Sequence, residues 1–391
     1  MSSHRPPRRG LQAAAALALA ALVLTGCNTS PPMTTFDPAG THAQNILDLL
    51  IPVAWAALGV FLVVEGILLY SVIRFRRRDD NAMPVQVHGN TRIEVMWTIA
   101  PALIVLVIAV LTFRTQAVNS VMPKDALRIV ATGHQWWFRF DYPQQGVATA
   151  SDMYIPVGRD VTVELHGEDV IHSFWVPRLA GKTDMIPNKT NYLTFRATEE
   201  GVFRGHCAEF CGEVHALMRF RVIAVPPDVF DRWIAAQRTE PARPAGDNPL
   251  AQRGTAVPVA PTATTGSPTA APAAAEAPAD PRARGQIVFL RKGCIGCHVV
   301  NGVPQAVGRT GPNLTYLGSR YTLAGGTLQN TDENLARWLR DPGGIKPGNK
   351  MAGAVRPGTL TDQEISDLVA YLNGMKLDIP IPSDPNPIEN P

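Results

Sequence analysis

The sequence predicts a multidomain chain with a two-helix transmembrane hairpin, an all-β domain, a flexible linker and a small all-α domain. Two apolar stretches lie at about residues 46–73 and 95–114. Each is long enough to supply the ~20 residues that a helix needs to cross a bilayer. Short β-rich runs punctuated by glycine and proline fill residues 116–238. Alanine, proline and threonine dominate residues 239–281, a composition that cannot bury a core and predicts a partly extended linker. Helical patterns return after it.

The first 27 residues have the layout of a secretory signal. Three arginines precede an apolar run at 11–24, which leads into Leu24-Thr-Gly-Cys27. That tetrapeptide resembles a bacterial lipoprotein processing box, so Cys27 is the predicted lipidation site. An ordinary signal peptide cleaved elsewhere, or an uncleaved span, is the alternative.

The hairpin at residues 45–115 has a predicted orientation. Arginines cluster in the short loop 74–78 between the two apolar stretches, and such loops stay in the cytoplasm. Both flanks of the hairpin are then extracytoplasmic. Glu65 lies deep in the first span, where it faces a partner subunit or is neutral. Glu94 begins the second span, where a helix-end acid interacts favourably with the helix dipole.

A short loop concentrates soft metal ligands. It reads Cys207-Ala-Glu-Phe-Cys211-Gly-Glu-Val-His215-Ala-Leu-Met218. Thiolate and thioether favour copper, and a second cysteine suggests two coppers bridged by two sulfurs. A local disulfide, or structural zinc bound with the help of His206, is the competing interpretation, but neither needs a methionine.

A second motif, Cys294-Ile-Gly-Cys297-His298, predicts covalently attached haem c. The two thiols add to the haem vinyl groups and the imidazole reaches the iron. A thioredoxin-like redox pair is the competitor, but Met351 supplies a second axial ligand in a downstream loop. Met375, at the end of a helical pattern, is predicted to pack. The two motifs and Cys27 account for all five cysteines.

The copper loop resembles the CuA-binding loop of cytochrome c oxidase subunit II. Asp169-Val-Ile-His172-Ser-Phe-Trp and Gly133-His-Gln-Trp136 also match that family. The resemblance implies a cupredoxin-like Greek-key barrel at 116–238. It also implies that the CuA ligands are His172, Cys207, the Glu209 carbonyl, Cys211, His215 and Met218. The Glu209 side chain would bind a magnesium or manganese ion shared with subunit I.

The same resemblance assigns three roles that the residues alone leave open. His172 is chosen over His134, His166 and His206 by the motif match alone. Trp136 reads by itself as a core aromatic, whereas its family counterpart is exposed above the copper and accepts electrons from cytochrome c. Glu94 matches a glutamate at the entrance of a proton-uptake channel. Arg139 departs from the acidic surface of animal-type relatives, which puts docking of a basic cytochrome in doubt.

Residues 282–376 resemble a class I cytochrome c domain, followed by a tail at 377–391. Helices are expected at Ala283–Lys292 and Asp332–Arg340, with a proline loop at 311–314 behind the haem. Thr361 and Glu364 have capping-box spacing for a last helix. The linker would span roughly 35 Å and give an effective concentration on the order of millimolar. The fused haem then reaches copper without strong charge complementarity.

The resemblance therefore implies the electron-input subunit of a bacterial caa-type haem-copper oxidase. It would pass electrons from cytochrome c, a cytochrome bc complex or the fused haem through CuA to haem a of subunit I. Oxygen reduction would occur in that partner, and the chain would lie in the bacterial inner membrane. A CuA-containing nitric oxide reductase subunit and a membrane-anchored copper carrier are the alternatives. The net charge of +3 does not suggest nucleic-acid binding.

Overall fold

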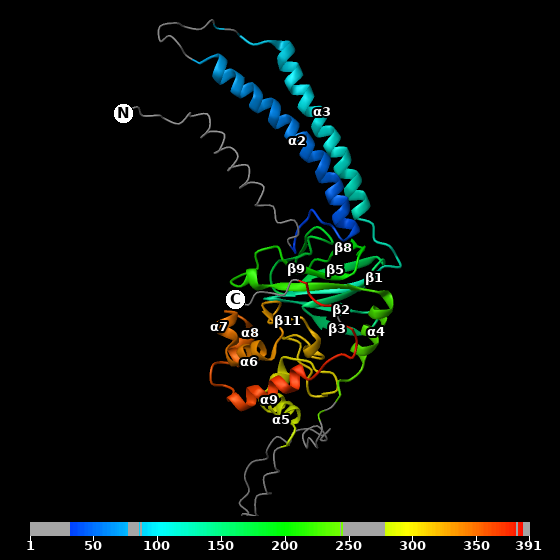
Figure 1. Cartoon of the computed structure of the whole chain (residues 1–391), viewed down its shortest axis with the longest axis vertical. Helices are drawn as coiled ribbons and strands as arrows, with labels where there is room; N and C mark the ends of the chain where they lie inside the picture. Colours follow the sequence, from blue (N-terminus) through cyan, green and yellow to red (C-terminus); the bar gives the residue numbers. More distant parts are fainter. Residues whose placement is uncertain are drawn as a thin grey trace, which may run out of the picture.

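The computed structural model describes residues 32–76, 86, 88–242, 244, 278–380 and 382–385. The predicted signal at 1–27 with the lipidation site Cys27 lies outside these residues, as do part of the arginine-rich loop and most of the predicted linker. The described chain forms a long helical pair, a β domain and a helical domain on the far side of it (Figure 1).

The two apolar stretches form the helices α2 (Thr41–Arg74) and α3 (Thr91–Asn119). They run side by side away from the β domain (Figure 1). Each contains an 18-residue window of high mean hydropathy, 2.4 in α2 and 2.5 in α3, and both helices are long enough to cross a membrane. Where they meet the β domain, Asn45 Nδ2 donates to Asn119 Oδ1 at 2.7 Å, which ties the two ends together.

Glu94 takes part in capping the N-terminus of α3. Asn90 caps the helix by accepting from the backbone N–H groups of Arg92 and Ile93. Glu94 Oε1 in turn accepts from the Asn90 backbone N–H at 3.2 Å. This reciprocal arrangement is a capping interaction, which agrees with the helix-end interpretation of this acid.

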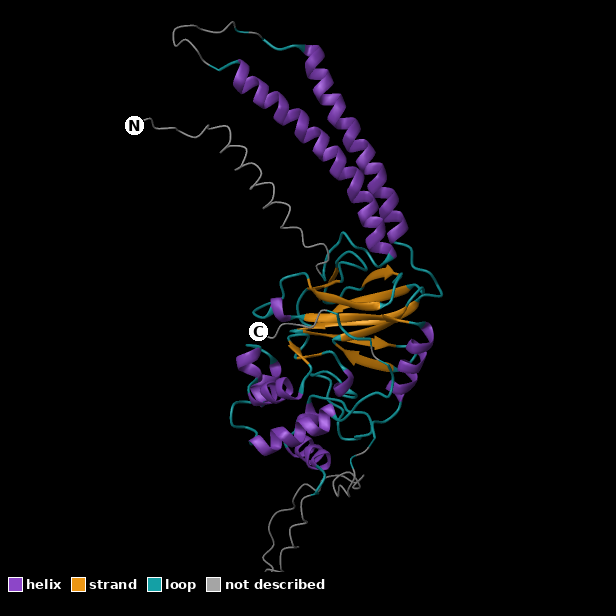
Figure 2. Cartoon of the chain, viewed as in Figure 1, coloured by secondary structure: helices purple, strands orange, loops and turns teal. Residues whose placement is uncertain are grey.

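The β domain consists of two five-stranded sheets stacked face to face (Figure 2). The first has the order β3-β2-β1-β5-β8, and the second β4-β10-β9-β6-β7. The pairs β1–β5 and β4–β10 are parallel, whereas the other neighbours run antiparallel. The strands are β1 (Leu127–His134), β2 (Trp137–Tyr142), β3 (Val147–Ala150), β4 (Asp152–Pro156), β5 (Val161–Gly167), β6 (His172–Trp175), β7 (Thr183–Met185), β8 (Asn191–Phe195), β9 (Gly201–Cys207) and β10 (Arg219–Val225).

Aromatic side chains fill the space between the two sheets. Phe220 of β10 packs against Phe138 of β2, with ring centroids 4.6 Å apart, and against Phe174 of β6 at 4.7 Å. All three are fully buried. Such a core fixes the two sheets rigidly and confirms the predicted all-β domain, because close-packed interiors resist small displacements.

The β-rich interpretation is wrong for the end of this domain, where helix α4 (Pro227–Arg238) forms. Pro227 begins the helix at a position where its missing N–H has no helical partner to lose. One face buries Phe230, Trp233 and Ile234. Trp233 stacks on Tyr154 of β4 at 4.5 Å, so the helix covers the edge of the sheet domain.

The C-terminal domain has more helices than predicted. It contains η2 (Cys294–Gly296), η3 (Leu317–Ser319), the strands β11 (Thr322–Leu323) and β12 (Leu328–Gln329), and the helices α5 (Pro281–Arg291), α6 (Asp332–Arg340), α7 (Pro342–Ile345), α8 (Lys350–Ala354) and α9 (Asp362–Asn373). Met351 lies in α8, which corrects its expected loop placement. The capping box of Thr361 and Glu364 is present, and Met375 is buried as predicted.

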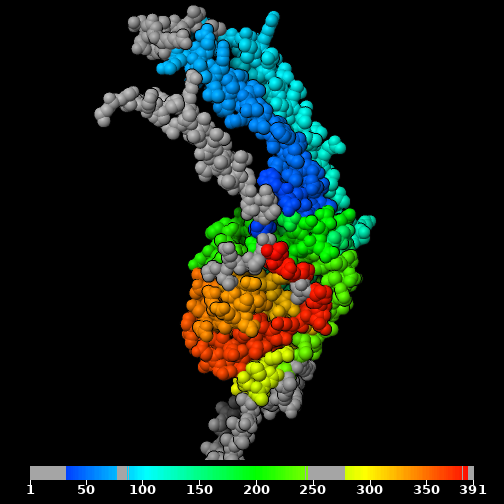
Figure 3. Space-filling view, in the orientation of Figure 1, coloured from blue at the N-terminus to red at the C-terminus, as the bar shows by residue number. Residues whose placement is uncertain are grey.

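The helical domain lies directly against the β domain (Figure 3). Arg219 N donates to Gly325 O at 3.0 Å, and Tyr321 N donates to Asp152 Oδ2 at 3.0 Å. The described part of the C-terminal tail also returns to the β domain. There Arg221 Nε donates to Asp384 Oδ2 at 2.9 Å, and the Arg221 side chain is 1% exposed. Two segments, residues 321–325 and the C-terminal tail, therefore attach to the β domain.

Candidate copper and haem sites

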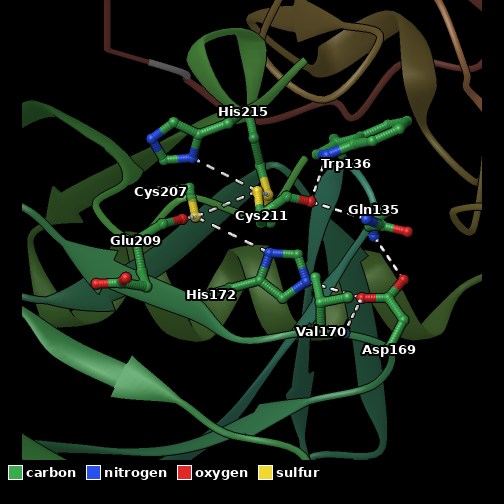
Figure 4. A network of polar contacts seen from close by, with 10 residues as sticks. Gln135, Trp136, Asp169, Val170, His172, Cys207, Glu209, Cys211 and His215 are labelled. Atoms are coloured by element: carbon green, nitrogen blue, oxygen red, sulfur yellow. Dashed lines mark hydrogen bonds and ion pairs between the residues drawn. The ribbon is translucent and has the colours of Figure 1, made fainter. Parts of the chain in front are cut away.

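Two neighbouring strands and one loop bring the sulfur and imidazole donors together. Cys207 ends β9, and His172 begins β6, which pairs with β9. The loop after β9 carries Cys211, turns through η1 (His215–Leu217) and reaches Met218 immediately before β10. Residues 35 positions apart in the sequence therefore face each other because their strands are adjacent (Figure 4).

The donor atoms converge around the two sulfurs. Cys207 Sγ and Cys211 Sγ are 3.8 Å apart. His172 Nδ1 lies 3.9 Å from Cys207 Sγ, and the Glu209 carbonyl oxygen lies 3.2 Å from the same sulfur. His215 Nδ1 lies 3.5 Å and Met218 Sδ 3.8 Å from Cys211 Sγ. All six predicted ligands thus gather at one place.

This geometry decides among the chemistries that the sequence left open. A disulfide needs sulfurs about 2.05 Å apart, so the two thiols are not bonded. Metal–thiolate bonds of about 2.3 Å allow two sulfurs at 3.8 Å to share metal ions. The thioether of Met218 stands against Cys211 and is fully buried, which suits a soft metal better than zinc. The residues fit a dinuclear copper centre.

The two thiols titrate very differently. The hydrogen bond that the two thiols share, helped by His172, lowers the pKa of Cys207 below its usual value. The same bond and burial raise the pKa of Cys211. Because metal ligation needs both sulfurs as thiolates, metal binding at this site is coupled to proton release.

Asp169 orients the buried His172 through the ring nitrogen that faces away from the two sulfurs. Its Oδ1 accepts from His172 Nε2 at 2.8 Å, and its Oδ2 accepts from the Gln135 backbone N–H at 2.8 Å. Burial opposes ionisation, yet these bonds and one from Val170 lower the pKa of Asp169 to about 2. The carboxylate thus keeps a proton on Nε2 and leaves Nδ1 for metal.

Replacing Asp169 by asparagine should lower copper affinity by about 10-fold to 100-fold, because the imidazole loses its anionic partner. Competition with a chelator, followed in the copper absorption bands, measures this loss. Glu168→Gln is the matched control, since Glu168 is the exposed neighbouring acid. Equal affinities of the two variants would contradict the orienting role.

The other candidate histidines of the β domain have different partners. His166 Nε2 lies 2.9 Å from Glu164 Oε1. His134 stacks on Trp137 at 4.5 Å, and His206 meets the ring of Trp175 edge-on at 5.0 Å. Among the described residues, the one group of His, Cys, Asp and Glu close enough to hold a metal ion is His172, Cys207 and Cys211.

Trp136 touches the copper loop directly. Its Nε1 donates to the Cys211 carbonyl oxygen at 3.0 Å, and Gln135 Nε2 donates to the same oxygen at 2.8 Å (Figure 4). The resemblance implied an exposed indole, but Trp136 is only 8% exposed here because the helical domain covers it. Arg139, the basic residue beside this tryptophan pair, forms an ion pair with Asp141, in which Nη2 lies 2.7 Å from Oδ1.

The haem-attachment motif lies on a short turn. Cys294 begins η2, Cys297 directly follows it, and both thiols are free. His298 Nδ1 donates to the Pro312 carbonyl oxygen at 2.8 Å, which leaves Nε2 available for iron. A Cβ added at Gly311 would lie 2.5 Å from His298 Cε1, so this glycine permits the close approach of the proline loop.

One cavity joins the haem motif to the β domain. It is lined by both motif cysteines, His298 and Met351, which are the predicted thioether and axial positions. Gln135, Trp136 and Trp137 of the β domain form part of its wall. The residues present therefore fit haem c, and the edge of its cavity reaches the residue that contacts the copper loop.

Both sites combine sulfur donors with imidazole, a set that suits metals which gain and lose one electron. On a chain with two helices long enough to span a bilayer, they define a membrane-attached electron-transfer protein.

Comparisons with known proteins agree. The family models for the transmembrane domain and the periplasmic domain of cytochrome c oxidase subunit II match residues 32–115 and 146–225, and the cytochrome c model matches residues 282–376. Cytochrome c oxidase subunit 2 of Alkalihalophilus pseudofirmus is 36% identical over 92% of this chain and 96% of its own length. That of Bacillus sp. PS3 is 35% identical over 92% and 95%. The periplasmic domain of Bradyrhizobium japonicum subunit II is 32% identical over 30% of this chain and 97% of its own, with a TM-score of 0.30.

The chain belongs to the cytochrome c oxidase subunit II family, in a form that carries a C-terminal cytochrome c domain. The family domains imply copper and haem c as cofactors and a membrane anchor in an oxidase complex.

Proposed function

We propose that this chain is the electron-input subunit of a respiratory haem-copper oxidase of the caa type. Electrons from cytochrome c or a cytochrome bc complex pass from the fused haem through the dinuclear copper to haem a of subunit I, which reduces O2 to water coupled to proton pumping. One observation carries the proposal. Trp136 lines the haem cavity and also donates a hydrogen bond to the Cys211 carbonyl of the copper loop.

The bound metals supply one-electron oxidation and reduction, and the protein supplies rigid positions for their ligands. Cys207 and His172 stand on paired strands of a close-packed sheet. Asp169 fixes the imidazole of His172, while Trp136 and Gln135 both hold the Cys211 carbonyl. Such fixed donors limit the movement that accompanies a change of charge, which favours fast electron transfer.

The covered indole supports the fused haem as the immediate electron source. With Trp136 only 8% exposed, a soluble cytochrome has little access to it in this arrangement. The external donor then delivers its electron to the haem held by Cys294, Cys297, His298 and Met351. Cys297 is exposed at the surface, so this edge of the haem site is open to such a donor.

Three further assignments follow from the family. The Glu209 carboxylate points away from the two sulfurs, which suits binding of magnesium or manganese shared with subunit I (Figure 4). Glu94, besides capping α3, stands where a proton-channel entrance of subunit I is expected. The copper and haem domains are extracytoplasmic, because the arginine-rich loop between α2 and α3 favours the cytoplasm.

Electron injection into the purified complex tests this function. A photochemical pulse that reduces haem c should be followed by its reoxidation, loss of the copper absorption band, reduction of the haem in subunit I, and oxygen consumption. Haem c that stays reduced while an external donor reduces copper would overturn the proposed path. Reduction of nitric oxide in place of oxygen would favour the nitric oxide reductase alternative, and purification without a haem-containing partner would favour the copper carrier.

A further inference from the structure

A buried lysine lies at the junction of the two domains. Lys346 follows α7 and is only 2% exposed. Its Nζ donates to the carbonyl oxygens of Trp136 at 2.7 Å, Ala324 at 2.8 Å and Leu217 at 3.2 Å. Thr327 Oγ1 lies 3.4 Å away. An ammonium has three N–H groups, so these three carbonyls match its donors one for one.

The partners of Lys346 belong to both domains and to both sites. Trp136 and Leu217 are in the β domain, whereas Ala324 is in the helical domain that also supplies the lysine. Trp136 contacts the copper loop, and Leu217 immediately precedes the predicted copper ligand Met218. One side chain therefore fastens the helical domain to the two backbone segments that border the copper site.

The backbone around Lys346 is shaped for this contact. A Cβ added at Gly325 would lie 2.5 Å from the Trp136 carbonyl oxygen and 2.9 Å from Lys346 Nζ. A Cβ added at Gly348, whose φ is +75°, would lie 3.1 Å from Trp136 Cη2. Glycines at both positions let the helical domain close on the backbone and on the ring of the same tryptophan.

Burying a lysine is unfavourable unless its charge is well hydrogen-bonded. Exposed charge pairs, which steer many transient complexes, tolerate several relative positions. Three carbonyls around one buried lysine amine tolerate few relative positions of the two domains. A small displacement would leave the amine and its acceptors buried without hydrogen-bond partners. The contact therefore selects one relative placement of the two domains.

We propose that Lys346 is a positioning residue that holds the haem cavity over Trp136, in the arrangement from which electrons pass to the copper site. This inference rests on the proposed function. The inference goes beyond that function, because it assigns the placement of the helical domain on the β domain to one buried side chain rather than to the linker alone.

Lys346→Met in the purified, metal- and haem-loaded complex tests the inference. Methionine has a similar length but no donor, so the three carbonyls lose their common partner. Lys376→Met, at an exposed position of the same domain, is the matched control. Unchanged copper and haem c spectra show that both sites remain folded.

The first readout is the paramagnetic relaxation of the copper signal by the nearby oxidised haem, which depends on their distance and not on turnover. The wild type and Lys376→Met should each give a single fast-relaxing population, whereas Lys346→Met should add a slow one. The second readout is the rate of haem c reoxidation after a photochemical pulse. We expect it to fall by about tenfold or more and to become sensitive to viscosity, because domain approach precedes transfer.

A Lys346→Met complex with wild-type relaxation and rate would overturn the inference. Absence of haem c reoxidation in the wild type would instead overturn the proposed function. Amine acetylation of the wild-type complex gives a test that needs no variant. Lys346 should react much more slowly than Lys376, and equal reactivity would count against its buried role.

Discussion

Cys211→Ser is expected to abolish the dinuclear copper signal while the haem c spectrum stays unchanged. Cys211 Sγ lies next to Cys207 Sγ, His215 Nδ1 and Met218 Sδ, so it contacts three of the other five predicted ligands. A hydroxyl is a hard donor and does not bridge two copper ions as a thiolate does. Electron paramagnetic resonance should show loss of the hyperfine pattern of one electron shared by two coppers, and copper affinity should fall by more than about 100-fold.

His206→Asn is the matched control for this experiment. His206 is adjacent to Cys207 in sequence, but its ring packs against Trp175 and it is outside the donor cluster. The shared-electron pattern should survive in this variant. A normal dinuclear signal in Cys211→Ser, or its loss in His206→Asn, would show that the ligand set is wrong.

Asp384→Asn should release the C-terminal tail from the β domain. Its carboxylate is the partner of Arg221, whose side chain is 1% exposed, and loss of one partner of a buried ion pair costs about 3 kcal/mol or more. An opening that is easier by this amount raises the rate of amide hydrogen exchange by about 100-fold. Mass spectrometry of the peptide that covers residues 377–385 measures this change in the intact chain.

Asp378→Asn provides the comparison within the same tail. Asp378 is exposed, so its substitution removes the same charge without disturbing a buried pair. Exchange in the tail should then match the wild type. Identical exchange rates for Asp384→Asn and Asp378→Asn would mean that the buried pair does not hold the tail.

The parts of the site that are local in sequence could be predicted from it. Cys207, Cys211, His215 and Met218 occupy one loop, and Cys294, Cys297 and His298 one turn, so spacing and donor chemistry suffice. His172 was different. Its place beside Cys207 depends on the pairing of β6 with β9, which no spacing rule contains, and only the family motif selected it. Asp169 carried a detectable signal three residues before His172, but its orienting role needed the observed hydrogen bonds.

The contacts between domains could not be predicted in the same way. Lys346 and Asp384 look like ordinary surface charges, because their partners in the β domain are more than 100 residues away in the sequence. Helix α4 was missed because it follows a long β-rich region directly, and its amphipathic face became evident only against Trp233 and Tyr154. The family resemblance implied an exposed Trp136, whereas the residues alone favoured a core aromatic. The domain that covers this indole leaves no mark on its local sequence.

In the proposed function, the covering of Trp136 changes the kinetic order of electron delivery to the copper site. A partner that must be captured from solution delivers electrons at a rate that follows its concentration and the ionic strength. A donor already seated on its acceptor delivers them at a rate that is the same in a dilute cell envelope and a crowded one, in low salt and in high. Under this proposal, the supply of electrons to copper is an internal property of one polypeptide, and the environment acts only on the re-reduction of the haem.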